Sequence, residues 1–185
     1  LIVVAGVAEI AAGSIAMGLG GYMGARTEKE HYEAEEKREY YEVEKLTHVE
    51  EAETADILRD FGVPEPQVPL VVNAIKQNPQ KWVDFMMKFE LGLERPDPRR
   101  LYQSPLIIGG AYALGGFVPL IPYIMFEHVS EALPISVLLS LIALFAFGAF
   151  KGYYTGQKLL RSALQTTFIG AVAAAAAFSI ARLIG

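Results

Sequence analysis

The chain has no cysteine among its 185 residues, which excludes both a disulfide framework and a thiolate metal site. Charge is also scarce outside one segment. Between Thr27 and Asp60 lie 13 of the 21 acidic residues but only 5 of the 16 basic ones. The net charge of −5 belongs mainly to that segment, which should attract cations rather than nucleic acid.

Three long stretches carry no charged residue: 101–126, 132–150 and 162–181. Each can cross a hydrocarbon core of about 30 Å as a helix. Backbone groups in lipid must bond within their own segment, so helices are the expected structure. Residues 1–25 form a fourth run, interrupted by Glu9 alone. The chain starts inside this run without a Met, so we expect further sequence upstream.

Basic residues near the ends of these runs predict the orientation. Beside the acidic segment lie Arg26, Arg95, Arg99 and Arg100. Between the last two runs lie Lys151, Lys158 and Arg161. The connection 127–131 has neither Lys nor Arg. Because cytosolic loops are enriched in Lys and Arg, the acidic segment and the 151–161 loop should both face the cytosol.

The middle of the chain predicts three soluble helices. Residues 28–59 contain no Gly or Pro and read as one long helix continuing from the first span. Phe61-Gly62 should end it, a second helix covers 66–77, and Asn78-Pro79 starts a third over 80–93. The predicted fold is an all-α polytopic membrane protein, with a span in 1–26, a three-helix insert in 27–98 and three spans in 99–185.

Four glutamates fall within an arc of about 80° on one face of the predicted long helix. They are Glu39, Glu42, Glu50 and Glu53. Like charges at this spacing destabilise a helix, and the nearby Lys37, Arg38 and Lys45 lie mainly off the stripe. Bound cations would relieve the repulsion, whereas a simple solvated face is the alternative. A di-iron site is disfavoured, because the Glu-x-x-His spacing of residues 28–31 has no second copy.

The segment WVDFMMKFE, residues 82–90, allows two interpretations. Met86 and Met87 lie one helical turn before Glu90 on the same side of a helix. Thioethers beside carboxylates suit a borderline transition metal such as Fe(II), Co(II) or Zn(II), and do not suit Ca(II) or Mg(II). The neighbouring aromatic residues favour ordinary core packing for both methionines. Spacing alone leaves both interpretations open.

Glu9 is an acid inside an apolar span, and such residues are costly and commonly functional. It could line a pore and hold either a proton or a cation, or it could hydrogen-bond a neighbouring helix. Met17 follows two helical turns later. Beside them runs a row of small residues that would let another helix approach closely, Ala8, Ala12, Ala16, Gly20 and Gly24.

Two segments resemble the vacuolar iron transporter family. AGVAEIAAGSIAMG, residues 5–18, resembles its second membrane span, and WVDFMMKFELGLERPDP, residues 82–98, resembles the end of its cytosolic metal-binding domain. The resemblance covers the chain apart from the family's first span. It implies a multi-pass homodimer of the vacuolar membrane with five spans per subunit. It also implies exchange of cytosolic Fe(II), and of related divalent metals such as Co, Zn, Mn and Ni, for vacuolar protons.

The same resemblance assigns roles to individual residues. It implies that Glu9 and Met17 are pore ligands. It implies that the ligands of the cytosolic domain are Glu39, Glu42, Glu50, Glu53, Met86, Met87 and Glu90. The sequence has no nucleophile elbow, phosphate-binding glycine loop or catalytic triad, so we expect a transporter rather than an enzyme. The alternative is a membrane-anchored interaction protein whose acidic helix binds a partner.

Overall fold

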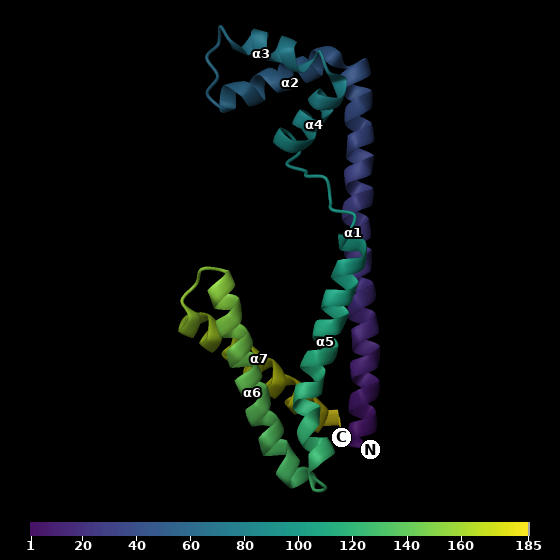
Figure 1. Ribbon diagram of the computed structural model, residues 1–185, viewed down its shortest axis with the longest axis vertical. Helices are drawn as coiled ribbons and strands as arrows, with labels where there is room; N and C mark the ends of the chain where they lie inside the picture. The colour runs from purple at the N-terminus through teal and green to yellow at the C-terminus, as the bar shows by residue number, and fades with distance from the viewer. Residues whose placement is uncertain (185) are drawn as a thin grey trace. The chain divides into compact units, whose positions relative to one another are not determined.

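The computed structural model describes residues 1–184, which form seven α-helices and no strand (Figure 1). This confirms the predicted all-α class. The helices are α1 (Ile2–Lys45), α2 (Thr47–Asp60), α3 (Val68–Ile75), α4 (Pro79–Phe89), α5 (Arg100–Met125), α6 (Val129–Tyr154) and α7 (Leu159–Ile184). The chain divides into two compact units. One is Leu19–Leu106, and the other combines Leu1–Gly18 with the chain from Ile107 onward.

Four helices are long and apolar enough to cross a membrane: α1, α5, α6 and α7. The last three are each 26 residues long, and their apolar windows are almost entirely unburied within the chain. A lipid environment accounts for so much exposed apolar surface. The four charge-poor runs of the sequence therefore correspond to four candidate spans, as predicted.

Glycines bring α1 and α5 into close contact in the first unit. A Cβ atom at Gly109 would lie only 2.8 Å from the backbone oxygen of Ser14, and one at Gly116 would lie 2.7 Å from Ile10 Cγ1. Residue numbers rise along α1 as they fall along α5, so the two helices run antiparallel. Small residues at such points let helix backbones approach and pack in a membrane.

The α6–α7 pair is a hairpin closed in the same way. A Cβ at Gly148 would lie 2.8 Å from Ala163 Cα, and one at Gly152 would lie 2.8 Å from Ser162 Cβ. The turn between the helices contains Gly156 at φ +67°, a conformation that residues with a Cβ rarely adopt. In contrast, the row from Ala8 to Gly24 has no such partner: Gly20 and Gly24 have open space within 4 Å among the described residues.

The second unit has a small hydrophobic core beneath α1, α2 and α4. Its buried members are Tyr32, Val43, Trp82, Val83, Met86 and Met87. A second cluster joins α2 to α3 through Leu58, Val68 and Val72. After α4 the chain is fastened back to α1 by two ion pairs, Arg95–Glu36 and Arg100–Glu28.

The prediction of one helix over 28–59 is wrong, because the helix breaks at Leu46. This residue has φ −116° and ψ 29°, and α2 leaves the axis of α1 at a steep angle (Figure 1). The Thr47 hydroxyl donates to the Val43 carbonyl at 2.9 Å across the break. Val43 and Ile57 both pack in the first cluster, and a straight helix would hold these residues about 21 Å apart. Burial against the other helices therefore outweighs the local helix preference.

The ends of the shorter helices were predicted with mixed success. Asn78 caps α4 as expected, since its side chain accepts from the Lys81 N–H at 3.1 Å, and Pro79 occupies the first turn. Gly62, at φ +81°, follows the end of α2. However, α3 and α4 are shorter than the predicted 66–77 and 80–93. Because the long helix breaks at Leu46, the insert consists of the last part of α1 together with α2, α3 and α4, rather than three helices.

The contact at Gly109 can be tested by substitution. Gly109→Ala should lower the thermal midpoint of the purified protein in detergent by several degrees, because the added methyl group meets the Ser14 carbonyl. Gly110→Ala is the matched control. It adds the same methyl group to open space and should leave the midpoint unchanged or slightly raised. Equal midpoints for the two variants would contradict the close packing of α1 on α5.

Candidate metal centre and membrane pocket

Five glutamates from three helices converge in the second unit. Glu39 and Glu42 lie on α1, Glu50 and Glu53 on α2, and Glu90 directly follows α4. The predicted single stripe is therefore replaced by two short acidic faces. The break at Leu46 turns these faces toward each other, so the carboxylates meet across a corner rather than along one helix.

The carboxylates form two adjoining triads. In the first, one oxygen from each of Glu39, Glu42 and Glu50 lies within 4.8 Å of the others. In the second, the same holds for Glu50, Glu53 and Glu90. Glu50 belongs to both, so the two triads share one carboxylate. Convergent oxygen atoms at this separation could coordinate a divalent cation.

Glu39 is fully buried, and neither of its carboxylate oxygens has a hydrogen-bond partner among the described residues. An ionised carboxylate in this situation is costly unless a proton or a metal ion compensates it. Burial, together with the negative charges of Glu90, Glu50 and Glu42, raises the pKa of Glu39 to about 8. The site therefore favours uptake of a positive charge at neutral pH.

The other members of the cluster show the same effect. Burial raises the pKa of Glu50 to about 7, with added repulsion from Glu53, Glu90 and Glu42. Burial also raises the pKa of Glu90, which Glu53 and Glu42 repel. One oxygen of Glu50 is buried without a hydrogen-bond partner in the described part of the chain. Desolvation and like charge thus act together on three carboxyls that share one small volume.

Met86 and Met87 lie in the core beside this cluster, with 0% and 1% of their surface exposed. The Met86 sulfur is 3.3 Å from the Thr54 hydroxyl, which accepts a hydrogen bond from Trp82 Nε1 at 2.8 Å. Thr54 lies one turn after Glu50 on α2. The structure therefore packs α4 against the acidic corner, the contact on which the metal-site interpretation of WVDFMMKFE depends. Core packing accounts for both buried methionines, and their role as ligands stays a prediction.

One basic residue lies closer to the cluster than predicted. Arg38 is 3.0 Å from Glu35 Oε2, 3.5 Å from Glu42 Oε2 and 4.0 Å from Glu39 Oε1. The expectation that it lies off the acidic stripe is wrong for this residue. The reason is that the guanidinium reaches one turn in both directions along α1, to positions i−3 and i+4.

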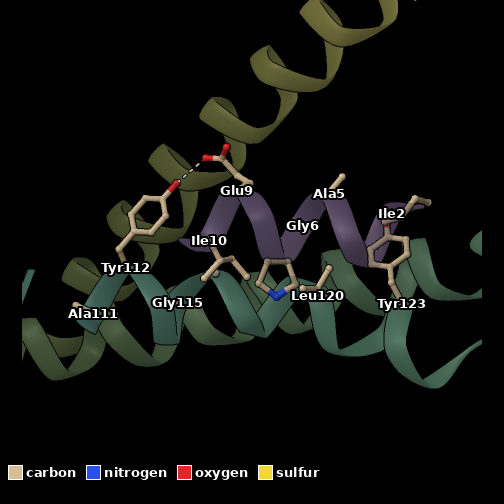
Figure 2. A pocket seen from close by; sticks show the side chains of 12 residues that line it. Ile2, Ala5, Gly6, Glu9, Ile10, Ala111, Tyr112, Gly115, Leu120 and Tyr123 are labelled. Carbon is tan, nitrogen blue, oxygen red and sulfur yellow. Dashed lines mark hydrogen bonds between the residues drawn. The ribbon is translucent and has the colours of Figure 1, made fainter. Parts of the chain in front are cut away.

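Glu9, which is exposed within the chain, is one of the residues that line a pocket of about 800 Å³ in the first unit, between the start of α1 and α5 (Figure 2). The lining is mostly apolar and includes Ile10, Tyr112 and Tyr123. The Tyr112 hydroxyl donates a hydrogen bond to Glu9 Oε1 at 3.0 Å, as the dashed line in Figure 2 shows. The neighbouring Gly13 makes room for the ring, because a Cβ there would lie 2.2 Å from Tyr112 Cε1.

The other predicted pore residue, Met17, is 48% exposed and lies outside the residues that line this pocket. Tyr112 was not predicted from the sequence. It is 103 positions from Glu9, and a tyrosine in an apolar span is common without any polar partner. Only the packing of α5 on α1 identifies it as a partner of the intramembrane acid.

Comparisons with known proteins support the same conclusion as the two motifs. Residues 1–182 match the VIT family. The chain belongs to the VIT family. It is 52% identical to vacuolar iron transporter 1 of Arabidopsis thaliana and 50% identical to vacuolar iron transporter 1 of Eucalyptus grandis, each over 184 residues. These alignments cover the whole chain and 74% of each relative. Protein CCC1 of Saccharomyces cerevisiae is 36% identical over 195 aligned residues, covering the whole chain and 60% of the relative.

The VIT-family match includes both segments on which the resemblance was based, residues 5–18 and 82–98. In this structure the first segment contains Glu9 and the second contains Met86, Met87 and Glu90. The resemblance to the family is therefore confirmed over almost the whole chain. The two motifs lie at the two acidic sites described above.

The raised pKa values predict how the effect of Glu39 on stability depends on pH. The folded protein binds the Glu39 proton more tightly than the unfolded chain does, because the pKa of an ordinary glutamate carboxyl is 4.5. Its contribution to stability is therefore present at low pH and is lost as the pH rises toward 8. Glu39→Gln should raise the thermal midpoint of the metal-free protein at pH 8 by about 2–4 °C, and should have little effect at pH 5.

This prediction is measured by the fluorescence of Trp82, the only tryptophan of the chain, which lies in the core beside the cluster. Glu33→Gln is the control, because Glu33 is exposed and lies outside both triads. Glu33→Gln should change the thermal midpoint by the same small amount at pH 5 and at pH 8. An equal effect of Glu39→Gln at pH 5 and pH 8 would contradict the raised pKa.

Proposed function

We propose that this chain is a proton-coupled transporter that moves Fe(II) and related divalent transition metals from the cytosol into the vacuole. The observation that carries the proposal is the meeting of five carboxylates in a chain with four candidate spans, whose relatives are named vacuolar iron transporters. The acidic corner collects the metal ion, and the membrane pocket at Glu9 passes it onward. The metal is the transported substrate, and the activity is not enzymatic.

The chemistry of the acidic corner supports metal collection. Its oxygens come from Glu39, Glu42, Glu50, Glu53 and Glu90, and buried thioethers lie beside them at Met86 and Met87. Carboxylates with a nearby thioether favour borderline ions such as Fe(II), Co(II) and Zn(II) over Mg(II). The domain 27–98 faces the cytosol in this proposal, in agreement with the arginines at the ends of its neighbouring spans.

A buried site also argues against the alternative of a membrane-anchored interaction protein. An acidic surface that binds a basic protein partner must be accessible to that partner. Glu39 is fully buried and Glu50 is 2% exposed, so the two carboxylates with the most strongly raised pKa values are not presented to a protein side chain.

Glu9 would couple metal movement to protons. A carboxylate in an apolar pocket holds either a proton or a cation, because an uncompensated charge is costly there. Exchange of one for the other is the minimum that antiport requires. Met17 adds a soft ligand two turns along the same helix. Tyr112 holds one oxygen of Glu9 and leaves the other available.

The transporter would act as a homodimer in the vacuolar membrane, with the pore at the interface. The small-residue row of α1 supports this arrangement. Its members Ala8, Ala12 and Ala16 are exposed, and Gly20 and Gly24 have open space beside them among the described residues. A second copy could approach closely along such a row.

Metal titrations test the cytosolic site. The purified protein in detergent should bind Co(II) or Zn(II) at least about tenfold more tightly than Mg(II), measured by calorimetry. Met86→Leu combined with Met87→Leu should remove most of this preference while leaving Mg(II) binding unchanged. Leucine preserves the core volume, so the fold should be retained.

Met23→Leu is the matched control, since Met23 is 57% exposed on α1 and lies far from the core cluster in sequence. It should bind every metal as the wild type does. Wild-type protein that binds Mg(II) as tightly as Co(II) would refute the transition-metal site. If the double variant keeps the preference for Co(II) or Zn(II) over Mg(II), the two methionines serve only in core packing.

Transport in liposomes tests the membrane site. With a pH gradient, Glu9→Gln should reduce uptake of Fe(II) or Co(II) at least about tenfold, because the amide cannot exchange a proton for a cation. Glu127→Gln, in the exposed connection after α5, should leave uptake intact. Undiminished uptake by Glu9→Gln would exclude Glu9 as the coupling carboxylate.

A further inference from the structure

Arg38 lies over the first carboxylate triad without occupying it. Its guanidinium forms its shortest ion pair with Glu35, at 3.0 Å, and Glu35 belongs to neither triad. The distances to the triad members Glu42 and Glu39 are longer, at 3.5 and 4.0 Å, and both oxygens of Glu39 lack a hydrogen-bond partner in the described residues. The side chain of Arg38 is 50% exposed, whereas that of Glu39 is 1% exposed.

This position matters because the carboxylates repel one another. Arg38 opposes the rise in the pKa of Glu39, Glu50 and Glu90, so its charge acts on both triads. The charge of Arg38 compensates the carboxylates only in part, since the pKa values of Glu39 and Glu50 are still raised to about 8 and about 7. A guanidinium is also too large and too distant to replace a metal ion, which would contact several of these oxygens directly at about 2.0–2.2 Å.

We propose that Arg38 is the resident counter-cation of the cluster, and that a divalent ion entering the triad of Glu39, Glu42 and Glu50 displaces it toward solvent. The proposal rests on the proposed function, in which this cluster binds the transported metal. A doubly charged ion and the guanidinium would repel each other at this separation. Arg38 therefore lowers the affinity of the site for metal while it stabilises the empty site.

The half-exposed position of Arg38 makes this exchange possible. Its long stem lets the guanidinium move into water without disturbing the core beneath, and Glu35 can keep it near the site. When the metal leaves, the arginine returns, so the carboxylates are never left wholly uncompensated. Moderate affinity suits a binding site that releases its metal ion to the transport pathway rather than storing it.

The test combines two measurements on the purified protein in detergent, Co(II) binding by calorimetry and the thermal midpoint of the metal-free protein from Trp82 fluorescence. Arg38→Gln should bind Co(II) about three- to tenfold more tightly than the wild type. The same variant should unfold at a lower temperature without metal. A residue that only supports the structure would lower both affinity and stability, so the opposite signs are diagnostic.

Two further variants serve as controls. Lys37→Gln removes the same charge one position earlier, where no ion pair forms within residues 1–184, and should leave both measurements unchanged. Arg38→Lys keeps the charge and should stay within about twofold of the wild type in affinity. If Arg38→Gln is unfolded without metal, Co(II) should restore its native Trp82 fluorescence.

The outcomes separate this proposal from the one on which it rests. Wild-type protein that fails to bind Co(II) overturns the proposed function of the cluster. Binding by the wild type with unchanged or weaker binding by Arg38→Gln overturns the role of Arg38 alone. Failure of Co(II) to restore an unfolded Arg38→Gln variant overturns it as well.

Discussion

Repulsion among buried carboxylates is the constraint around which the second unit is built. Five glutamates share one corner of the fold, and burial shields two of them, Glu39 and Glu50, from the water that would otherwise separate their charges. Such an arrangement persists only when the surrounding structure holds it in place. Here the hydrophobic core beneath α1, α2 and α4 does so, with Trp82, Val83, Met86 and Met87 almost wholly buried.

The two interpretations of the methionines are compatible for this reason. Packing of α4 against α2 fixes the position of Glu90, and the same packing buries Met86 and Met87. The packing of α4 against α2 therefore forms both the hydrophobic core and the acidic site. The Trp82–Thr54 hydrogen bond joins them, since Thr54 lies one turn after the shared Glu50.

The first unit also contains a carboxylate whose partner comes from a distant part of the chain. This carboxylate, Glu9, is one of the residues that line an apolar pocket, and a hydroxyl from a neighbouring helix meets it. Close approach of the helices makes the contact possible, because Gly13 leaves space for the Tyr112 ring. In both units the packing of helices brings an acidic side chain together with residues from distant parts of the chain.

Sequence patterns alone were enough to predict the helical class, the four candidate spans, the cap at Asn78 and the two family motifs. These features rest on local properties, namely the length of apolar runs, capping side chains and short residue patterns. The sequence also indicated which glutamates to consider, because acidic residues in such density are conspicuous in a largely apolar chain.

How those residues meet depends on the packing of the helices. No glycine or proline near Leu46 indicates in the sequence that the helix breaks there. The break results from burial of α2 against α3 and α4. The contacts of Tyr112 with Glu9 and of Trp82 with Thr54 join residues 103 and 28 positions apart. Helix propensity and hydropathy act over a few neighbouring residues, whereas packing, burial and charge compensation depend on which distant side chains share the same volume.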